Sequence, residues 1–119
     1  MTSKKDQWPS PVEPSNLRDH FTTTYRLNSD QVEVMLKSSA LSLATTLAKL
    51  QKAIDENHGY GEISRLSHSL KGVLLNMGEL EWAELARRIE KAAGAEEQEK
   101  YRDIVCGIRS GVEKFLERD

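Results

Sequence analysis

The distribution of proline is the feature that most restricts how this 119-residue chain can fold. Its three prolines are Pro9, Pro11 and Pro14, so residues 15–119 contain none. Proline interrupts a helix because it lacks a backbone N–H and clashes with the preceding turn. A long proline-free stretch therefore favours helices. The sequence predicts an all-α domain over residues 15–119, preceded by a flexible, proline-containing arm over residues 1–14.

Apolar residues in the domain recur at spacings of three and four, as in helices that bury one face. The pattern predicts five helices: about 15–27, 30–57, 61–77, one ending at Gly94, and one beginning at the acidic residues 96–99. Because the connections are short, we expect an antiparallel up-and-down four-helix bundle with an additional short N-terminal helix.

Several local features of these helices lead to further predictions. Asp30 and Glu33 have the spacing of a capping box at the start of the second helix. Gly107 and Gly111, four residues apart on the last helix, indicate close packing against that helix. Cys106 is expected to be a small buried apolar residue, because its helix contains no histidine that would activate the thiol.

Composition excludes several classes of protein. The chain has 17 basic and 19 acidic side chains and a pI near 5.9, which disfavours nucleic-acid binding. No apolar run is long enough for a membrane span, and one cysteine cannot form an internal disulfide. The three histidines are scattered without metal-ligand spacing, so we expect neither a metal nor a cofactor. A cytoplasmic location is expected, because no secretory signal is recognisable. A monomer is the simplest expectation for the oligomeric state.

The third predicted helix has a distinctive polar face. At about 100° per residue, its apolar residues fall within one sector of roughly 100°; these are Ile63, Leu66, Leu70, Val73, Leu74 and Met77. His68 lies about 180° from the centre of that sector, so its ring is expected in solvent. Ser64, Lys71, Gly72 and Leu75 fall on the same side as His68.

This face combines the properties that a phosphoryl-accepting histidine needs. A neutral imidazole has a nucleophilic nitrogen near pH 7. Lys71 brings a cation near the ring, and Leu75 adds an apolar side chain to the exposed face. Gly72 costs about 1 kcal/mol of helix stability relative to alanine. An offsetting benefit is expected, and the missing side chain would leave space beside the ring of His68.

The segment from His68 to Gly72, H-S-L-K-G, is followed by N-M-G at residues 76–78. It resembles the signature of histidine-containing phosphotransfer (Hpt) domains, which typically read H-x-L-K-G and then N-L-G. Further along the chain, Leu85, Ala86, Ile89 and Glu90 loosely follow the rhythm of that family.

The resemblance implies that His68 accepts a phosphoryl group from a receiver-domain aspartate and passes it to another receiver. Lys71 would stabilise the phosphoryl group, Gly72 would provide clearance, and Ser64 and Leu75 would contact the partner. The partners would be response-regulator receiver domains and a hybrid sensor kinase, with Mg²⁺ bound by the receiver. The chain itself would be a phosphocarrier and not an enzyme, without a kinase or ATP-binding module.

Two other functions share some of these features. A helical adaptor would bind a partner through the face around Leu75 and leave His68 chemically idle. The dimerisation region of a histidine kinase also exposes a histidine, but its usual H-E-x-x-x-P pattern is missing, because Ser69 follows His68 and no proline is nearby. The adaptor is therefore the alternative that the sequence leaves open.

Overall fold

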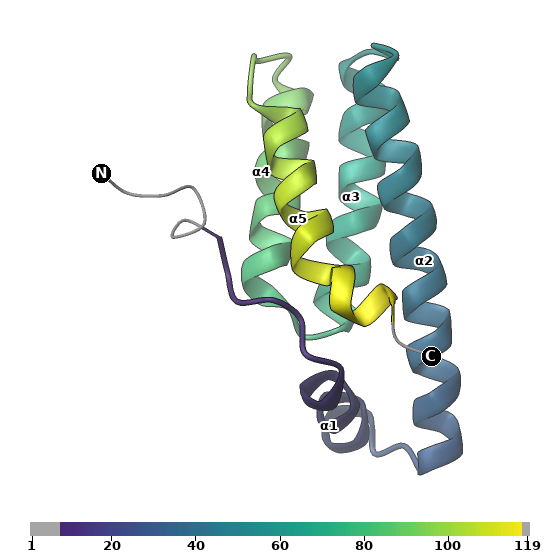
Figure 1. The fold of residues 1–119 in the computed structure, drawn as a ribbon. Helices are drawn as coiled ribbons and strands as arrows, with labels where there is room; N and C mark the ends of the chain where they lie inside the picture. The colour runs from purple at the N-terminus through teal and green to yellow at the C-terminus, as the bar shows by residue number, and fades with distance from the viewer. Residues whose placement is uncertain (1–7, 118–119) are drawn as a thin grey trace.

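A computed structural model describes residues 8–117 of the chain. Over this range the regular elements are five helices: α1 (Pro14–Tyr25), α2 (Ser29–Asp55), α3 (Tyr60–Asn76), α4 (Leu80–Gly94) and α5 (Tyr101–Leu116). The all-α prediction is confirmed for these residues. In Figure 1, α2 to α5 lie side by side along one long axis, and α1 packs against the N-terminal part of α2. None of the helices described is long and apolar enough to cross a membrane.

The core lies between α2, α3, α4 and α5 and is formed by the apolar face of each of these helices, with Leu17 and Phe21 of α1 adding to it. Helix α3 contacts α2 and α4, and α5 closes the other side by packing on α2 and α4. The residues predicted to face inward from α3 are buried except Val73, which is half-buried. The largest fully buried side chains include Trp82, Phe21 and Phe115. Burial of one apolar face per helix leaves the opposite faces of α3 and α4 available to solvent.

The start of α2 differs from the prediction. Asn28 is the N-cap: its side chain accepts a hydrogen bond from the Gln31 N–H, and the Gln31 side chain accepts one from the Asn28 N–H, both at 2.9 Å. The capping box proposed for Asp30 and Glu33 is therefore wrong. Asn28 is favoured because its extended backbone lets its own amide oxygen reach the first turn. Glu33 forms an ion pair with Arg18 of α1 instead.

The start of α5 also differs from the prediction. The acidic residues Glu96, Glu97 and Glu99 lie in the α4–α5 connection, and α5 begins at Tyr101. Glu99 accepts two hydrogen bonds of 3.0 Å from the Arg88 guanidinium and one of 2.8 Å from the Lys100 N–H. These contacts hold the connection against α4 and lower the pKa of Glu99, with the Arg88 hydrogen bond as the main cause. Glu99 also directly precedes Lys100, the N-cap of α5, so its charge both fixes the connection and lies at the N-terminus of that helix.

Residues 8–13 do not form the flexible arm that the sequence predicted. Val12 is buried, and its N–H donates to the Gly111 carbonyl at 2.8 Å. The Trp82 indole N–H donates to the Ser10 carbonyl, also at 2.8 Å. The prediction is wrong here because an apolar side chain and satisfied backbone groups outweigh the entropy of a free tail. Residues 1–7, the remainder of the predicted arm, lie outside the described residues.

The close packing predicted at the two glycines of α5 is confirmed, and the groups that pack there are indole rings. A Cβ at Gly107 would lie 2.8 Å from the ring of Trp8, and one at Gly111 would overlap the ring of Trp82.

Cys106, predicted to be buried, is exposed. The buried face of α5 is formed by its neighbours, which include Val105 and Ile108. Helical geometry turns Cys106 away from that face.

Candidate functional site

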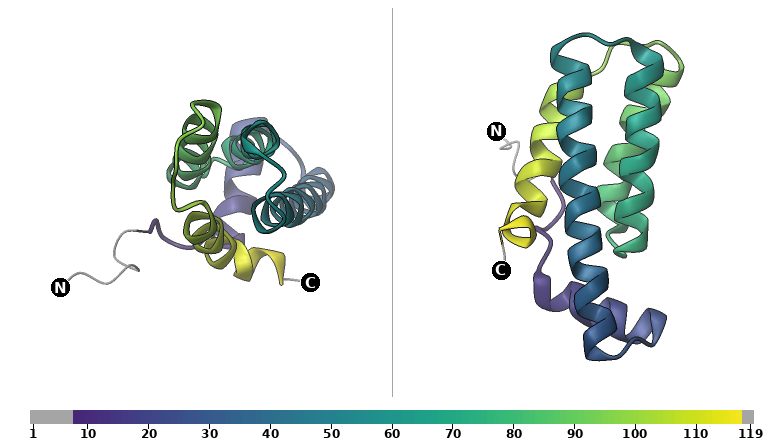
Figure 2. Two further views of the ribbon diagram at one scale, coloured as in Figure 1. Left: turned by 90° about the horizontal axis from the view of Figure 1, so that it is seen from above. Right: turned by 90° about the vertical axis from the view of Figure 1, so that its right-hand side faces the viewer.

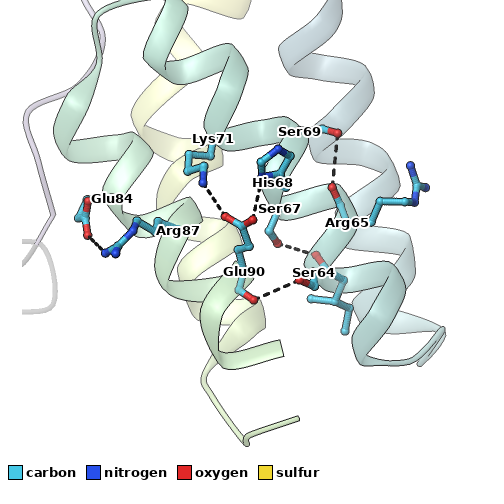
Figure 3. A network of polar contacts seen from close by, with 10 residues as sticks. Ser64, Arg65, Ser67, His68, Ser69, Lys71, Glu84, Arg87 and Glu90 are labelled. Atoms are coloured by element: carbon cyan, nitrogen blue, oxygen red, sulfur yellow. Dashed lines mark hydrogen bonds and ion pairs between the residues drawn. The ribbon is translucent and has the colours of Figure 1, made fainter. Parts of the chain in front are cut away.

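His68 lies near the middle of α3 and points away from the core, as its helical position predicted. Its side chain is 67% exposed, whereas Leu66 and Leu70 of the same helix are buried. The ring stands at the border between α3 and α4, where Figure 3 shows it beside Lys71 and Glu90. The imidazole of His68 is therefore accessible to a partner, and Lys71 and Glu90 are the charged groups beside it.

Glu90 of α4 joins His68 and Lys71. One carboxylate oxygen, Oε2, lies 2.8 Å from the His68 Nδ1, and the other, Oε1, lies 2.8 Å from the Lys71 Nζ. The side chains of Glu90 and Lys71 are each only 23% exposed, so this ion pair is partly shielded from water. The result is a three-residue cluster in which one carboxylate positions both an imidazole and an ammonium group.

The contact with Glu90 selects the tautomer of His68. An ionised carboxylate only accepts hydrogen bonds, so Nδ1 must carry the hydrogen and donate it. The pKa of Glu90 lies below its ordinary value, chiefly because Lys71 donates to it, with His68 contributing and burial partly opposing. Glu90 is therefore ionised near pH 7. In the neutral ring, Nε2 then holds the free lone pair.

Two serines of α3 lie beside the cluster and use their hydroxyls within the protein. The Ser64 hydroxyl donates to the backbone carbonyl of Glu90 at 3.2 Å, which links α3 to α4 beside the cluster. The Ser67 hydroxyl is buried and donates to the Ile63 carbonyl at 2.7 Å. Ser64, predicted to contact a partner, is half-buried and uses its hydroxyl within the protein.

The rest of the predicted site lies on the open face of α3. A Cβ at Gly72 would meet nothing within 4 Å, so the space beside this residue is empty of other protein atoms. Leu75 is 47% exposed, about two turns beyond His68. The predicted residues His68, Gly72 and Leu75 lie on one surface of α3, and Lys71 lies at its border with α4.

A comparison with models of known protein families identifies the family of this chain. A family model described as the Hpt domain matches residues 34–117, more than half of the chain. The chain belongs to the Hpt domain family. Hpt domains carry out histidine phosphotransfer in two-component systems as phosphocarriers, and they interact with receiver domains and histidine kinases. Searches of curated proteins and of solved structures found no match to this chain.

The residue of this Hpt domain to which sequence reasoning assigned no role is Glu90. It entered only as part of a loose continuation of the family motif, because nothing in a one-dimensional pattern pairs it with His68, 22 residues earlier. The available signal was one of three acidic residues on a helix whose apolar face is well defined. Such residues are usually solvated, so the assignment needed the packing of α3 on α4.

Glu90→Gln is expected to remove a pH-dependent contribution to the stability of this Hpt domain. Because the folded state lowers the pKa of Glu90, the unfolded state binds more protons in the carboxyl range. The stabilisation is therefore present above the ordinary carboxyl pKa and is lost as the pH falls through the lowered folded value. Urea unfolding between pH 7 and pH 3 should show wild type more stable at pH 7, with the difference closing on acidification.

Glu84→Gln is the matched control for that experiment. Glu84 lies on the same helix and pairs with Arg87 at 2.9 Å, but the two side chains are 68% and 48% exposed. An ion pair so open to water contributes little, so this variant should follow the wild-type stability profile. An equal loss of stability in Glu90→Gln at pH 7 and pH 3 would contradict the role given to the Glu90 charge.

Proposed function

We propose that this Hpt domain is a phosphorelay shuttle, in which His68 accepts a phosphoryl group from a receiver-domain aspartyl phosphate and passes it to the aspartate of another receiver. The proposal rests on the Glu90 contact to the His68 Nδ1, which leaves the Nε2 lone pair free on an exposed ring. A nucleophile oriented by a neighbouring group and open to a partner is suited to this transfer.

In the proposed step, the Nε2 lone pair attacks phosphorus, and an N–P bond forms as the P–O bond to the aspartate breaks. The aspartate leaves as a carboxylate, and no proton has to leave Nε2. The phosphorylated ring keeps its Nδ1 hydrogen and therefore carries a positive charge. The Glu90 carboxylate, 2.8 Å from Nδ1, would stabilise that charge. Transfer to the second receiver reverses these bond changes.

Lys71 would stabilise the phosphoryl group on the ring. Its Nζ is held by Glu90 at 2.8 Å, on the same carboxylate that contacts the ring. The phosphoryl group adds nearly two negative charges, so the flexible lysine side chain can share its ammonium between Glu90 and a phosphoryl oxygen. Mg²⁺ would be bound by the receiver, and this chain would supply no cofactor.

The scaffold of the proposal is the antiparallel up-and-down four-helix bundle that the short connections predict. The contacts of α3 with α2 and α4 support it, as do those of α5 with α2 and α4. Leu75, exposed near His68, would form part of the surface that contacts receivers and a hybrid sensor kinase. We propose that the chain acts as a monomer, because the bundle buries its apolar faces within one copy.

The proposal is tested by passing a phosphoryl group through the protein. An isolated receiver charged with radiolabelled acetyl phosphate is freed of the donor and mixed with this Hpt domain, and an uncharged second receiver is then added. The label should appear on the Hpt domain in an acid-labile, alkali-stable form and then move to the second receiver. Absence of label on the Hpt domain with every receiver tested would refute the relay.

Gly72→Ala should separate stability from transfer. The added methyl meets nothing within 4 Å, so the helix gains roughly 0.5–1 kcal/mol of stability from the better helix former. The same methyl lies on the face that a docked receiver must approach, so transfer should slow by about tenfold or more through misplacement of the reacting groups. Thermal unfolding and the rate of phosphotransfer measure the two effects.

Gly61→Ala is the control for this variant. Gly61 is also on α3 and also has nothing within 4 Å of an added Cβ, but it lies two turns before His68, in the first turn of the helix. It should leave the transfer rate unchanged. A Gly72→Ala protein that transfers as fast as wild type would show that the open space at this position has no part in docking.

A further inference from the structure

Helix α1 lies outside the part of the chain that the family model matches, which begins at residue 34. Both views in Figure 2 place the C-terminal half of α1 below the end of α3. In the right-hand view this half projects toward the side of the bundle that α3 and α4 occupy. The chain therefore places an additional element next to the end of the helix that carries His68.

Two side chains of α1 attach to one carbonyl at the end of α3. The Tyr25 hydroxyl donates to the carbonyl oxygen of Asn76 at 3.1 Å, and the His20 Nε2 contacts the same oxygen at 3.1 Å. The last carbonyls of a helix have no partner within the helix, so α1 supplies the missing donors. His20 also lies over Gly78, where an added Cβ would come within 2.6 Å of its ring. The junction between α1 and the α3–α4 turn is therefore specific.

This junction holds an aromatic ring at the surface. Tyr25 contacts the rings of His20 and Phe21, with centroids 5.7 Å and 6.0 Å away, yet it is 41% exposed. Leu75 and Leu80, on either side of the same α3–α4 turn, are 47% and 66% exposed. We call Tyr25, Leu75 and Leu80 the foot patch. Its tyrosine is fixed before any partner binds, which lowers the entropy lost on association.

A protein interface of standard size is large enough to cover both the foot patch and His68. Asn76 follows His68 by eight residues, which corresponds to about 12 Å along α3. A standard interface covers about 800 Å² on each partner, equivalent to a disc with a radius of about 16 Å. A protein that brings its aspartate to His68 therefore covers the end of α3 as well, if it docks centrally on this face.

We propose that α1 extends the receiver-docking surface, with Tyr25 as the contact that distinguishes one receiver domain from another. This inference rests on the proposed relay, because the partner is identified by its need to reach His68. The foot patch continues the His68 face through Leu75, which belongs to both surfaces. Tyrosine is enriched among the residues that dominate interface energy, and α1 presents one that is 41% exposed and open to a partner.

The test measures phosphotransfer from a panel of isolated receiver domains charged with acetyl phosphate to wild type, Tyr25→Ala and Tyr25→Phe. Tyr25→Ala should lower kcat/KM by roughly five- to tenfold for receivers that use the patch. The size of this decrease should differ between receivers, so the order of the receivers by kcat/KM should change. Tyr25→Phe keeps the ring, and His20 still contacts Asn76, so its rates should stay within about twofold of wild type.

Two further measurements separate docking from folding and from chemistry. Leu80→Ser alters the same patch without touching the hydrogen bonds to Asn76, so it should lower the same rates even if Tyr25→Ala weakens the fold. Direct labelling of His68 by phosphoramidate, a small donor that needs no docking surface, should be unchanged in both variants. Unchanged receiver rates in Tyr25→Ala and Leu80→Ser would overturn this inference and leave the relay standing. Wild type that accepts label from no receiver would overturn both.

Discussion

His68→Gln is expected to abolish phosphoryl labelling by receiver domains completely. Glutamine has a similar reach but no ring nitrogen with a lone pair for attack on phosphorus. Because the His68 side chain is 67% exposed, its replacement removes no core packing, and stability should stay within about 0.5 kcal/mol of wild type. The loss of label would therefore report chemistry and not unfolding, as circular dichroism and thermal unfolding can verify.

His58→Gln is the matched control for this experiment. His58 is exposed in the α2–α3 connection and lies 3.2 Å from Glu56, so it shares the exposure and an acidic neighbour with His68. Its replacement should leave labelling at the wild-type level. Acid-labile label that persists on His68→Gln would assign the phosphoryl group to another residue. A wild type that binds receivers but takes no label would favour the adaptor, acting through the face around Leu75.

Gly111→Ala should lower the stability of the protein more than Gly107→Ala does, whereas Gly72→Ala is expected to raise it. The new Cβ would overlap the ring of Trp82, which is 2% exposed and donates a hydrogen bond to the Ser10 carbonyl. A ring enclosed in this way cannot move aside, and overpacking of a core typically costs about 1–3 kcal/mol. For a domain of this size, the melting temperature should fall by roughly 10 °C. Differential scanning calorimetry measures the change.

Gly107→Ala is the comparison for that variant. An added Cβ at Gly107 would lie 2.8 Å from Trp8, but this ring belongs to the half-buried N-terminal segment and not to the core. Trp8 precedes the hydrogen bonds that hold Ser10 and Val12, so its ring can shift outward without breaking them. The loss of stability should therefore be clearly smaller than for Gly111→Ala. Equal melting temperatures for Gly111→Ala and wild type would show that Trp82 can repack, contrary to its enclosed position.

The sequence alone was sufficient to predict which face of α3 carries the candidate site. The fixed period of a helix places Leu66 and Leu70 inward and His68 outward without knowledge of the neighbouring helices. The same period predicted the buried faces of the other helices. The prediction was wrong at Cys106, on the exposed face of α5, because it relied on the general burial of cysteine and not on the helical position.

Contacts between distant segments required the tertiary structure. Glu90 reaches His68 across 22 residues, Trp82 reaches Ser10 across 72, and Tyr25 reaches Asn76 across 51. A hydrophobic period shows which side of a helix is buried, but it does not identify the polar side chain that a neighbouring helix brings to its edge. The local sequence thus determined that the His68 imidazole is exposed. The packing of distant helices decided its tautomer, its link to Lys71 through Glu90 and the position of α1.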